Sequence, residues 1–197
     1  MTHKTSLDIE RALHALGEIL APEGIDIGVV VLGGAALNLL GIVERTTRDV
    51  DVLAISYSTA DLQQLSLQAP EPLPEPLKSA ILRVARDFGL PEDWVDTTMG
   101  AQWKTGLPPG LKRRLHWRRF GGLLVGLVDR YDLIFFKLYA AADSGGTSSV
   151  HYQDLIALRP TSKELEEASK WIRGQDPSAG FSTILDQVIE QAKKDVR

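Results

Sequence analysis

The spacing of apolar residues in the first part of the chain predicts a helix followed by two strands. Over residues 7–20, leucines and alanines recur about one helical turn apart, which is typical of an amphipathic helix. Residues 27–32 form a short apolar run rich in β-branched side chains, so we expect a buried strand there. The pattern then predicts a glycine turn at 33–34, a helix over 35–40 and a second strand over 49–55.

The middle of the chain has shorter apolar runs that prolines and glycines separate. Residues 69–76 have proline at every second position, which excludes a helix interior because proline lacks the N–H donor and fixes φ. Around this connector we expect helices over 59–67 and 77–88, a brief strand over 94–97, a loop over 106–110, and late strands of the same sheet over 113–120 and 122–128.

From residue 129 onward the pattern is almost entirely helical. The expected helices cover 129–143, 150–158, 163–173 and 181–194. The fold class is therefore α/β (α+β), a mixed sheet flanked by helices with a helical C-terminal part. We divide the chain into a core over 1–128 and a helical part over 129–197 packed on it.

Composition narrows the class of protein. The chain has 197 residues, 44% of them hydrophobic, which suits a globular protein with a sizeable core. The net charge of −4 argues against bulk nonspecific binding of nucleic acid. The absence of cysteine excludes disulfides, thiolate zinc sites and a cysteine nucleophile. Neither a signal peptide nor a membrane-spanning apolar run is visible, so we expect a cytoplasmic protein with no membrane partner.

Two aspartates in the second predicted strand are the strongest candidates for chemistry. Asp49 and Asp51 lie at positions i and i+2, whose side chains share one face of a strand. Paired carboxylates repel each other unless a cation lies between them, and Mg²⁺ or Mn²⁺ takes carboxylate oxygens while keeping positions for phosphate. The backbone of Gly33 and Gly34 can approach a phosphate because no Cβ intervenes. The alternative is a solvated strand edge without function.

The residues around the aspartate pair leave several roles open. Arg45 and Arg48 either form surface salt bridges or contact a triphosphate. Thr47, with Thr46, either caps or orients the acidic strand. Asp96, in the short strand predicted near Trp94, is a candidate third carboxylate. The basic run over 112–119 either blunts a sheet edge or binds RNA, with Trp117 available for stacking.

The first of these motifs resembles the signature of a known superfamily. Gly33-Gly34, Arg45 and the run from Thr47 to Asp51 look like the nucleotidyltransferase superfamily with the DNA polymerase β-type fold. The closer resemblance is to AbiEii-like toxins and related bacterial nucleotidyltransferases. Their K-x-x-A motif is matched by Lys137-Leu138-Tyr139-Ala140, and their later aspartate by Asp154. Gln153 departs from the charged residue that often precedes that aspartate.

The resemblance, which spans residues 30–158, implies a reaction and its site. The reaction would transfer a nucleoside monophosphate from an NTP to RNA such as a tRNA 3′ end, to a protein or to a small molecule. The implied catalytic residues are Asp49, Asp51, Lys137 and Asp154, with Mg²⁺ or Mn²⁺ on the first two. The implied nucleotide-binding residues are Gly33, Gly34, Arg45, Thr47 and Arg48.

A toxin role with a cognate antitoxin as partner also follows only from the resemblance. The alternative to an enzyme is a catalytically inactive module of the same fold that binds nucleotide or another protein.

Overall fold

The computed structural model describes residues 6–44, 47, 49–59 and 65–196, and it divides into two compact units. The first unit runs to Thr105 and includes Arg114–Val128. The second unit consists of Gly106–Arg113 and Asp129–Arg197. Residues 106–113 therefore cluster with the helical unit and separate two stretches of the first one.

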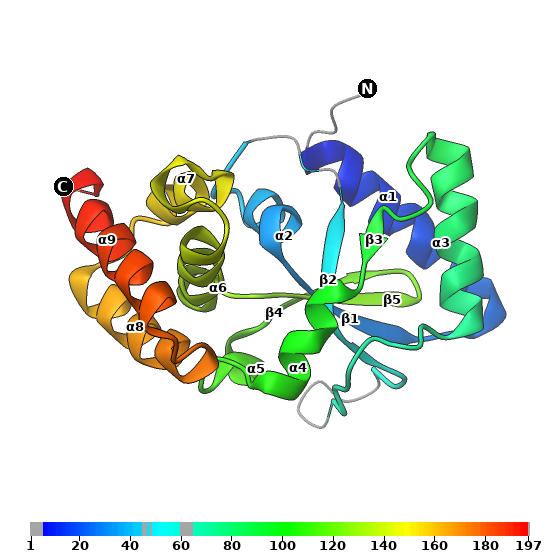
Figure 1. Ribbon diagram of the computed structural model, residues 1–197. Helices are drawn as coiled ribbons and strands as arrows, with labels where there is room; N and C mark the ends of the chain where they lie inside the picture. Colours follow the sequence, from blue (N-terminus) through cyan, green and yellow to red (C-terminus); the bar gives the residue numbers. More distant parts are fainter. Residues whose placement is uncertain (1–5, 45–46, 48, 60–64, 197) are drawn as a thin grey trace. The chain divides into compact units, whose positions relative to one another are not determined.

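The first unit is built on a five-stranded mixed sheet (Figure 1). The strands are β1 (Ile27–Leu32), β2 (Val50–Ser56), β3 (Val95–Asp96), β4 (His116–Phe120) and β5 (Leu123–Leu127). Their order is β3-β2-β1-β5-β4. The central strand β1 is antiparallel to β2 and parallel to β5, while β3 is parallel to β2 and β4 is antiparallel to β5. The predicted mixed sheet flanked by helices is confirmed.

Helices complete the first unit. They are α1 (Ser6–Leu20), η1 (Ala21–Glu23), α2 (Gly33–Leu39), α3 (Glu75–Phe88), η2 (Thr98–Gly100) and α4 (Ala101–Thr105). The apolar faces of α1 and α3 meet each other and the sheet, and Leu13, Leu16, Leu77 and Ile81 are buried there. All six residues of β1 and all five of β5 are buried, as expected for strands covered on both faces.

The second unit is helical in the part that the structure describes. Its helices are α5 (Leu111–Arg114), which ends one residue beyond the unit, α6 (Arg130–Asp143), η3 (Gly146–Ser148), α7 (Val150–Ala157), α8 (Ser162–Gln175) and α9 (Ala179–Asp195). Aromatic rings join α6 to α8, with the ring centroids of Phe135 and Phe136 lying 5.9 and 5.8 Å from that of Trp171. Side chains cap α6 and α8. Asp129 accepts a hydrogen bond from the N–H of Tyr131 at the start of α6, and Thr161 forms a capping box with Glu164 at the start of α8.

Arg130 links the start of α6 to the turn before α8 through hydrogen bonds. Its guanidinium holds Glu164 through two hydrogen bonds of 2.7 and 3.3 Å, and it donates to the carbonyls of Leu158 and Arg159 at 2.8 Å each. Burial raises the pKa of Glu164, but hydrogen bonds from Arg130 and Thr161 and the charge of Arg130 outweigh it, so the pKa lies below its ordinary value. The turn therefore depends on a carboxylate that stays ionised.

One predicted strand begins later than expected, and one predicted helix lies largely outside the described residues. The strand expected from residue 113 begins at His116, because Lys112, Arg113 and Arg114, all good helix formers, continue the short helix α5. The helix expected over 59–67 falls largely on residues 60–64, which lie outside the described residues, and residues 65–67 are not helical. The short helices over 98–105 were not predicted.

Close backbone contact joins α1 to the turn between β4 and β5. The carbonyl of Gly17 accepts from the N–H of Gly122 at 3.0 Å, and a Cβ on Gly17 would lie 1.6 Å from the carbonyl oxygen of Phe120. Gly121 has φ +55°, and a Cβ on it would meet the carbonyl oxygen of Gly17 at 2.7 Å. Glycine at these positions lets α1 dock directly on the sheet.

We therefore expect Gly17→Ala to lower the free energy of unfolding by about 1–3 kcal/mol, because the methyl group displaces α1 from the β4–β5 turn. The measurement is urea unfolding followed by circular dichroism. Gly174→Ala is the matched control, since a Cβ on Gly174 in α8 meets nothing within 4 Å. That control should unfold at the same or slightly higher urea concentration. Equal stability of Gly17→Ala and the native protein would contradict the docking described here.

Candidate functional site

A glycine turn ends β1 at the middle of the sheet. Leu32 is still extended, with φ −129° and ψ −161°, whereas Gly33 has φ +68°, in the left-handed region that favours glycine. Gly33 and the buried Gly34 then open the short helix α2. The predicted turn thus lies where the central strand of the sheet gives way to a helix.

The Asp51 carboxylate lies directly against this turn. In the antiparallel ladder Asp51 pairs with Leu32, the residue before Gly33. A Cβ built on Gly33 would lie only 1.8 Å from Oδ2 of Asp51 and 2.9 Å from its Cγ. Any side chain at position 33 would therefore displace the carboxylate. Gly33 is required both by its φ and by the space that Asp51 occupies.

Asp49 lies immediately before β2, which begins at Val50 rather than at Asp49. Its backbone carbonyl accepts a hydrogen bond of 3.2 Å from the hydroxyl of Thr47. Thr47 itself is only 6% exposed, so its side chain faces the protein and fixes the approach to the strand. The half-buried side chains of Asp49 and Asp51 remain partly accessible. Of the two roles left open for Thr47, the geometry fits the orienting one.

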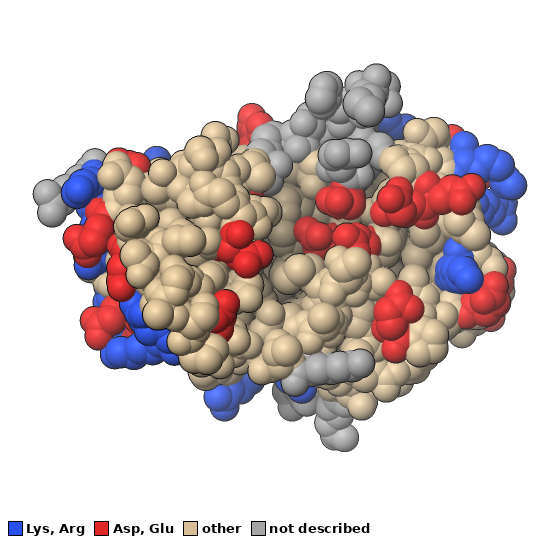
Figure 2. Space-filling view, in the orientation of Figure 1, with Lys and Arg blue, Asp and Glu red and all other residues tan. Residues whose placement is uncertain are grey.

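Asp96 is the register partner of Asp51 on the neighbouring strand. The parallel pairing of β2 and β3 sets Val50 beside Val95 and Asp51 beside Asp96. Paired residues of adjacent strands point to the same side of a sheet. One oxygen of Asp96 accepts from the N–H of Thr98 at 2.7 Å. Figure 2 shows acidic side chains on this face over the region where Figure 1 draws β2 and β3.

The carboxylates of Asp49 and Asp51 are suitable ligands for a hard divalent cation, but they supply only two protein ligands. Asp51 offers carboxylate oxygens directly against the Gly33 turn, and Asp49, two residues earlier in the chain, offers a second carboxylate. Among the described residues no group of three or more histidine, aspartate or glutamate side chains converges as a metal site. A cation held by two carboxylates completes its coordination with phosphate oxygens and water. The predicted contacts Arg45 and Arg48 lie outside the described residues.

Lys137 and Asp154, the two other predicted catalytic residues, meet in the second unit. Lys137 lies on α6 and Asp154 on α7, and Nζ of the lysine is 2.8 Å from Oδ2 of the aspartate. The side chains are only 6% and 1% exposed. The structure thus brings these two residues together as a buried ion pair, with the neighbouring Gln153 exposed.

The basic run over 112–119 is divided between α5 and β4. Arg119 on β4 forms a 2.6 Å ion pair with Asp26 and donates to the hydroxyl of Thr59 at 2.8 Å. Burial raises the pKa of Asp26, but hydrogen bonds from Thr59 and Arg119 and the charge of Arg119 bring it below its ordinary value. The ring of Trp117 covers Gly126, where a Cβ would meet it at 2.6 Å. Arg119 and Trp117 therefore have structural partners.

Sequence reasoning missed a second polar contact of α7. The hydroxyl of Tyr152 donates to Asp195 on α9 at 2.6 Å. Burial, with the hydrogen bond and the charge of Asp195, raises the pKa of Tyr152. Tyr152 and Asp195 are 43 residues apart, and nothing in the spacing of the sequence pairs them. The contact ties the helix that carries Asp154 to α9.

The buried ion pair yields a stability prediction. Lys137→Met should lower the free energy of unfolding by about 3–5 kcal/mol, because it leaves the Asp154 carboxylate buried without its cation. The double variant Lys137→Met/Asp154→Leu should regain most of that loss. Lys163→Met is the control, since Lys163 is exposed and its nitrogen is 4.0 Å from Glu167. Chemical denaturation measures all three, and a double variant no more stable than Lys137→Met would overturn the assignment.

Comparisons with other proteins do not assign the chain to a family. Comparison of the chain with protein-family models, curated proteins and solved structures finds no significant match. None of the helices in the described part of the chain has the length and apolar character that a bilayer crossing requires. The residues around Gly33 and Asp51 are therefore the only indication of a function in the described part of the chain.

Proposed function

We propose that the protein is a metal-dependent nucleotidyltransferase whose site lies at the end of β1. The observation that supports it most is the contact of the Asp51 carboxylate with the α-carbon of Gly33. It puts an acidic cation ligand and a side-chain-free turn next to each other, and the antiparallel pairing of β1 and β2 fixes both. A triphosphate with its cation needs these two features at one place.

In this proposal Asp49 and Asp51 hold Mg²⁺ or Mn²⁺. The bound cation would supply charge neutralisation for the phosphates and a lower pKa for an attacking oxygen. The acceptor hydroxyl gives up its proton to water, its oxygen forms a bond to the α-phosphorus of the NTP, and the bond from that phosphorus to the bridging oxygen of the β-phosphate breaks. Pyrophosphate leaves with the electron pair. Backbone N–H groups at Gly33 and Gly34 contact the phosphates, where no side chain at position 33 intervenes.

The remaining predicted residues have supporting roles in the proposal. Thr47 fixes the approach of the chain to Asp49 through its hydrogen bond to the Asp49 carbonyl. Asp154 keeps Lys137 paired and buried within the second unit. The action of Lys137 on phosphate and of Asp154 as a base or orienting group remains a proposal from the resemblance, as do Arg45 and Arg48 as phosphate contacts. A toxin role with a cognate antitoxin is proposed on the same ground.

A second candidate is a nucleotide-binding module without turnover. The hydrogen bond from the Thr98 N–H to Asp96 favours it, because it engages one oxygen of the carboxylate best placed to join Asp51. Such a module would bind an NTP with Mg²⁺ and release it unchanged. Binding and turnover must therefore be measured separately.

The test is transfer of label from each α-³²P-labelled NTP in the presence of Mg²⁺, with total RNA and total protein as acceptors. We expect covalent label on one acceptor from α-labelled NTP and none from γ-labelled NTP, because pyrophosphate is the leaving group. Asp51→Asn should reduce transfer by about 100-fold or more, since it removes a charged ligand while keeping the shape of the side chain.

Asp93→Asn is the matched control, because Asp93 is exposed in the loop before β3 and should leave transfer unchanged. Saturable NTP binding without label transfer would select the binding module. Transfer that Asp51→Asn leaves intact would refute both candidates at this site.

A further inference from the structure

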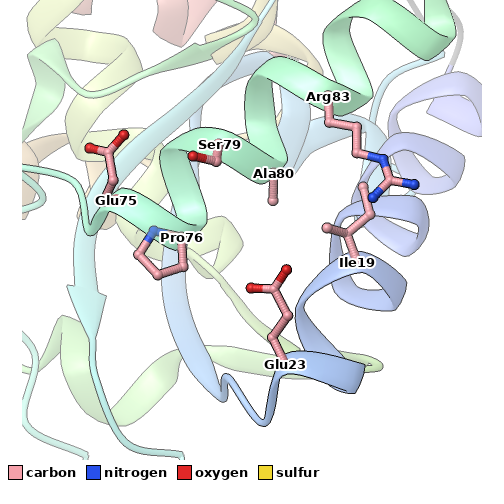
Figure 3. A pocket seen from close by; sticks show the side chains of 7 residues that line it. All are labelled: Ile19, Glu23, Glu75, Pro76, Ser79, Ala80 and Arg83. Carbon is pink, nitrogen blue, oxygen red and sulfur yellow. The ribbon is translucent and has the colours of Figure 1, made fainter.

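A hollow in the first unit lies between α1 with η1 and the N-terminal part of α3, and its lining includes none of the residues of the Gly33 turn. Its volume is about 420 Å³, within the range of small-molecule sites. Figure 3 shows the side chains that line it from these helices. The ones that matter for recognition are Ile19, Glu23, Glu75, Ser79, Ala80 and Arg83.

Two carboxylates line this hollow without a partner among the described residues. Glu23 lies in η1 and Glu75 in the first turn of α3. Within the described part of the chain neither side chain takes part in an ion pair or a side-chain hydrogen bond. Figure 3 shows the Glu23 carboxylate directed from η1 toward α3. An ammonium group in the hollow would find an unengaged anion there.

A guanidinium reaches the same hollow from α3. Arg83 lies two helical turns after Glu75, and Figure 3 shows its head directed toward Ile19 of α1. Its Nε is 3.9 Å from Asp87, at the outer limit of an ion pair, which leaves the terminal nitrogens able to bind a carboxylate. The hollow therefore offers both signs of charge.

The surface between these charged groups is apolar. Ile19 is half-buried, Ala80 is buried, and Pro76 continues this surface. The hydroxyl of Ser79 adds one neutral polar group. An apolar side chain placed over Ile19 and Ala80 would lose water-exposed surface on binding, which is favourable in proportion to its apolar area.

We propose that this hollow binds a small zwitterion of the dipeptide class with apolar side chains. Its ammonium lies against Glu23, with the charge of Glu75 favouring the same group, and its carboxylate lies on Arg83. Arg83 would repel a purely cationic ligand, and the carboxylates of Glu23 and Glu75 would repel a purely anionic one. The site is independent of the proposed nucleotidyl transfer.

The test is isothermal titration of the intact protein with leucyl-leucine, its N-acetyl form and its C-terminal amide. We expect saturable binding of leucyl-leucine and about fivefold weaker binding of each blocked form, the effect of one solvent-exposed ion pair. Glu23→Gln should abolish the preference over the N-acetyl form, and Arg83→Gln should abolish the preference over the amide. Glu92→Gln, an exposed substitution outside the hollow, should change neither.

The blocked dipeptides test the proposal on the unaltered protein, so it does not depend on the variants folding. Absence of saturable binding, or equal binding of the free and blocked dipeptides, would overturn it. Asp51→Asn should bind leucyl-leucine as the native protein does, so that failure of this proposal and failure of the proposed nucleotidyl transfer give different results.

Discussion

The antiparallel pairing of β1 with β2 is the constraint on which the candidate site depends. It sets Leu32 opposite Asp51, and so brings the carboxylate against the α-carbon of Gly33. The same pairing places β2 between β1 and β3, where Asp96 becomes the neighbour of Asp51. If the register slipped by one residue, Asp51 would face the opposite side of the sheet and the arrangement would be lost. Such a slip is costly because it would turn the Asp51 carboxylate to the side on which Val50 and Val52 are buried.

Local signals in the sequence were sufficient to predict the elements around this site. The β-branched run over 27–32, the glycine pair and the apolar alternation after Asp49 each act within a few residues, and the strands formed within one residue of the expected positions. The helix over 111–114 was missed because a run of basic residues suits a helix and an edge strand equally well. The strand itself begins only at His116.

The contacts between distant residues were not predictable in the same way. No pattern in the sequence shows that Asp51 and Asp96 are register partners, because strand order depends on how the helices cover the sheet. The ion pair between Lys137 and Asp154 likewise joins two helices whose apolar spacing gives no sign of it. Both residues were singled out through resemblance, and their burial as a pair gives them a structural role in the second unit whatever their part in a reaction.

The most direct test of the central claim is the location of a bound divalent cation. Mn²⁺ broadens the NMR signals of nearby nuclei, so a titration of the ¹⁵N-labelled protein with substoichiometric Mn²⁺ maps its site. The account predicts that the amide signals of Gly33, Gly34 and Asp51 broaden first, and that Asp51→Asn removes this effect. Broadening confined to other parts of the chain, or unchanged by Asp51→Asn, would contradict a cation site at the Gly33 turn.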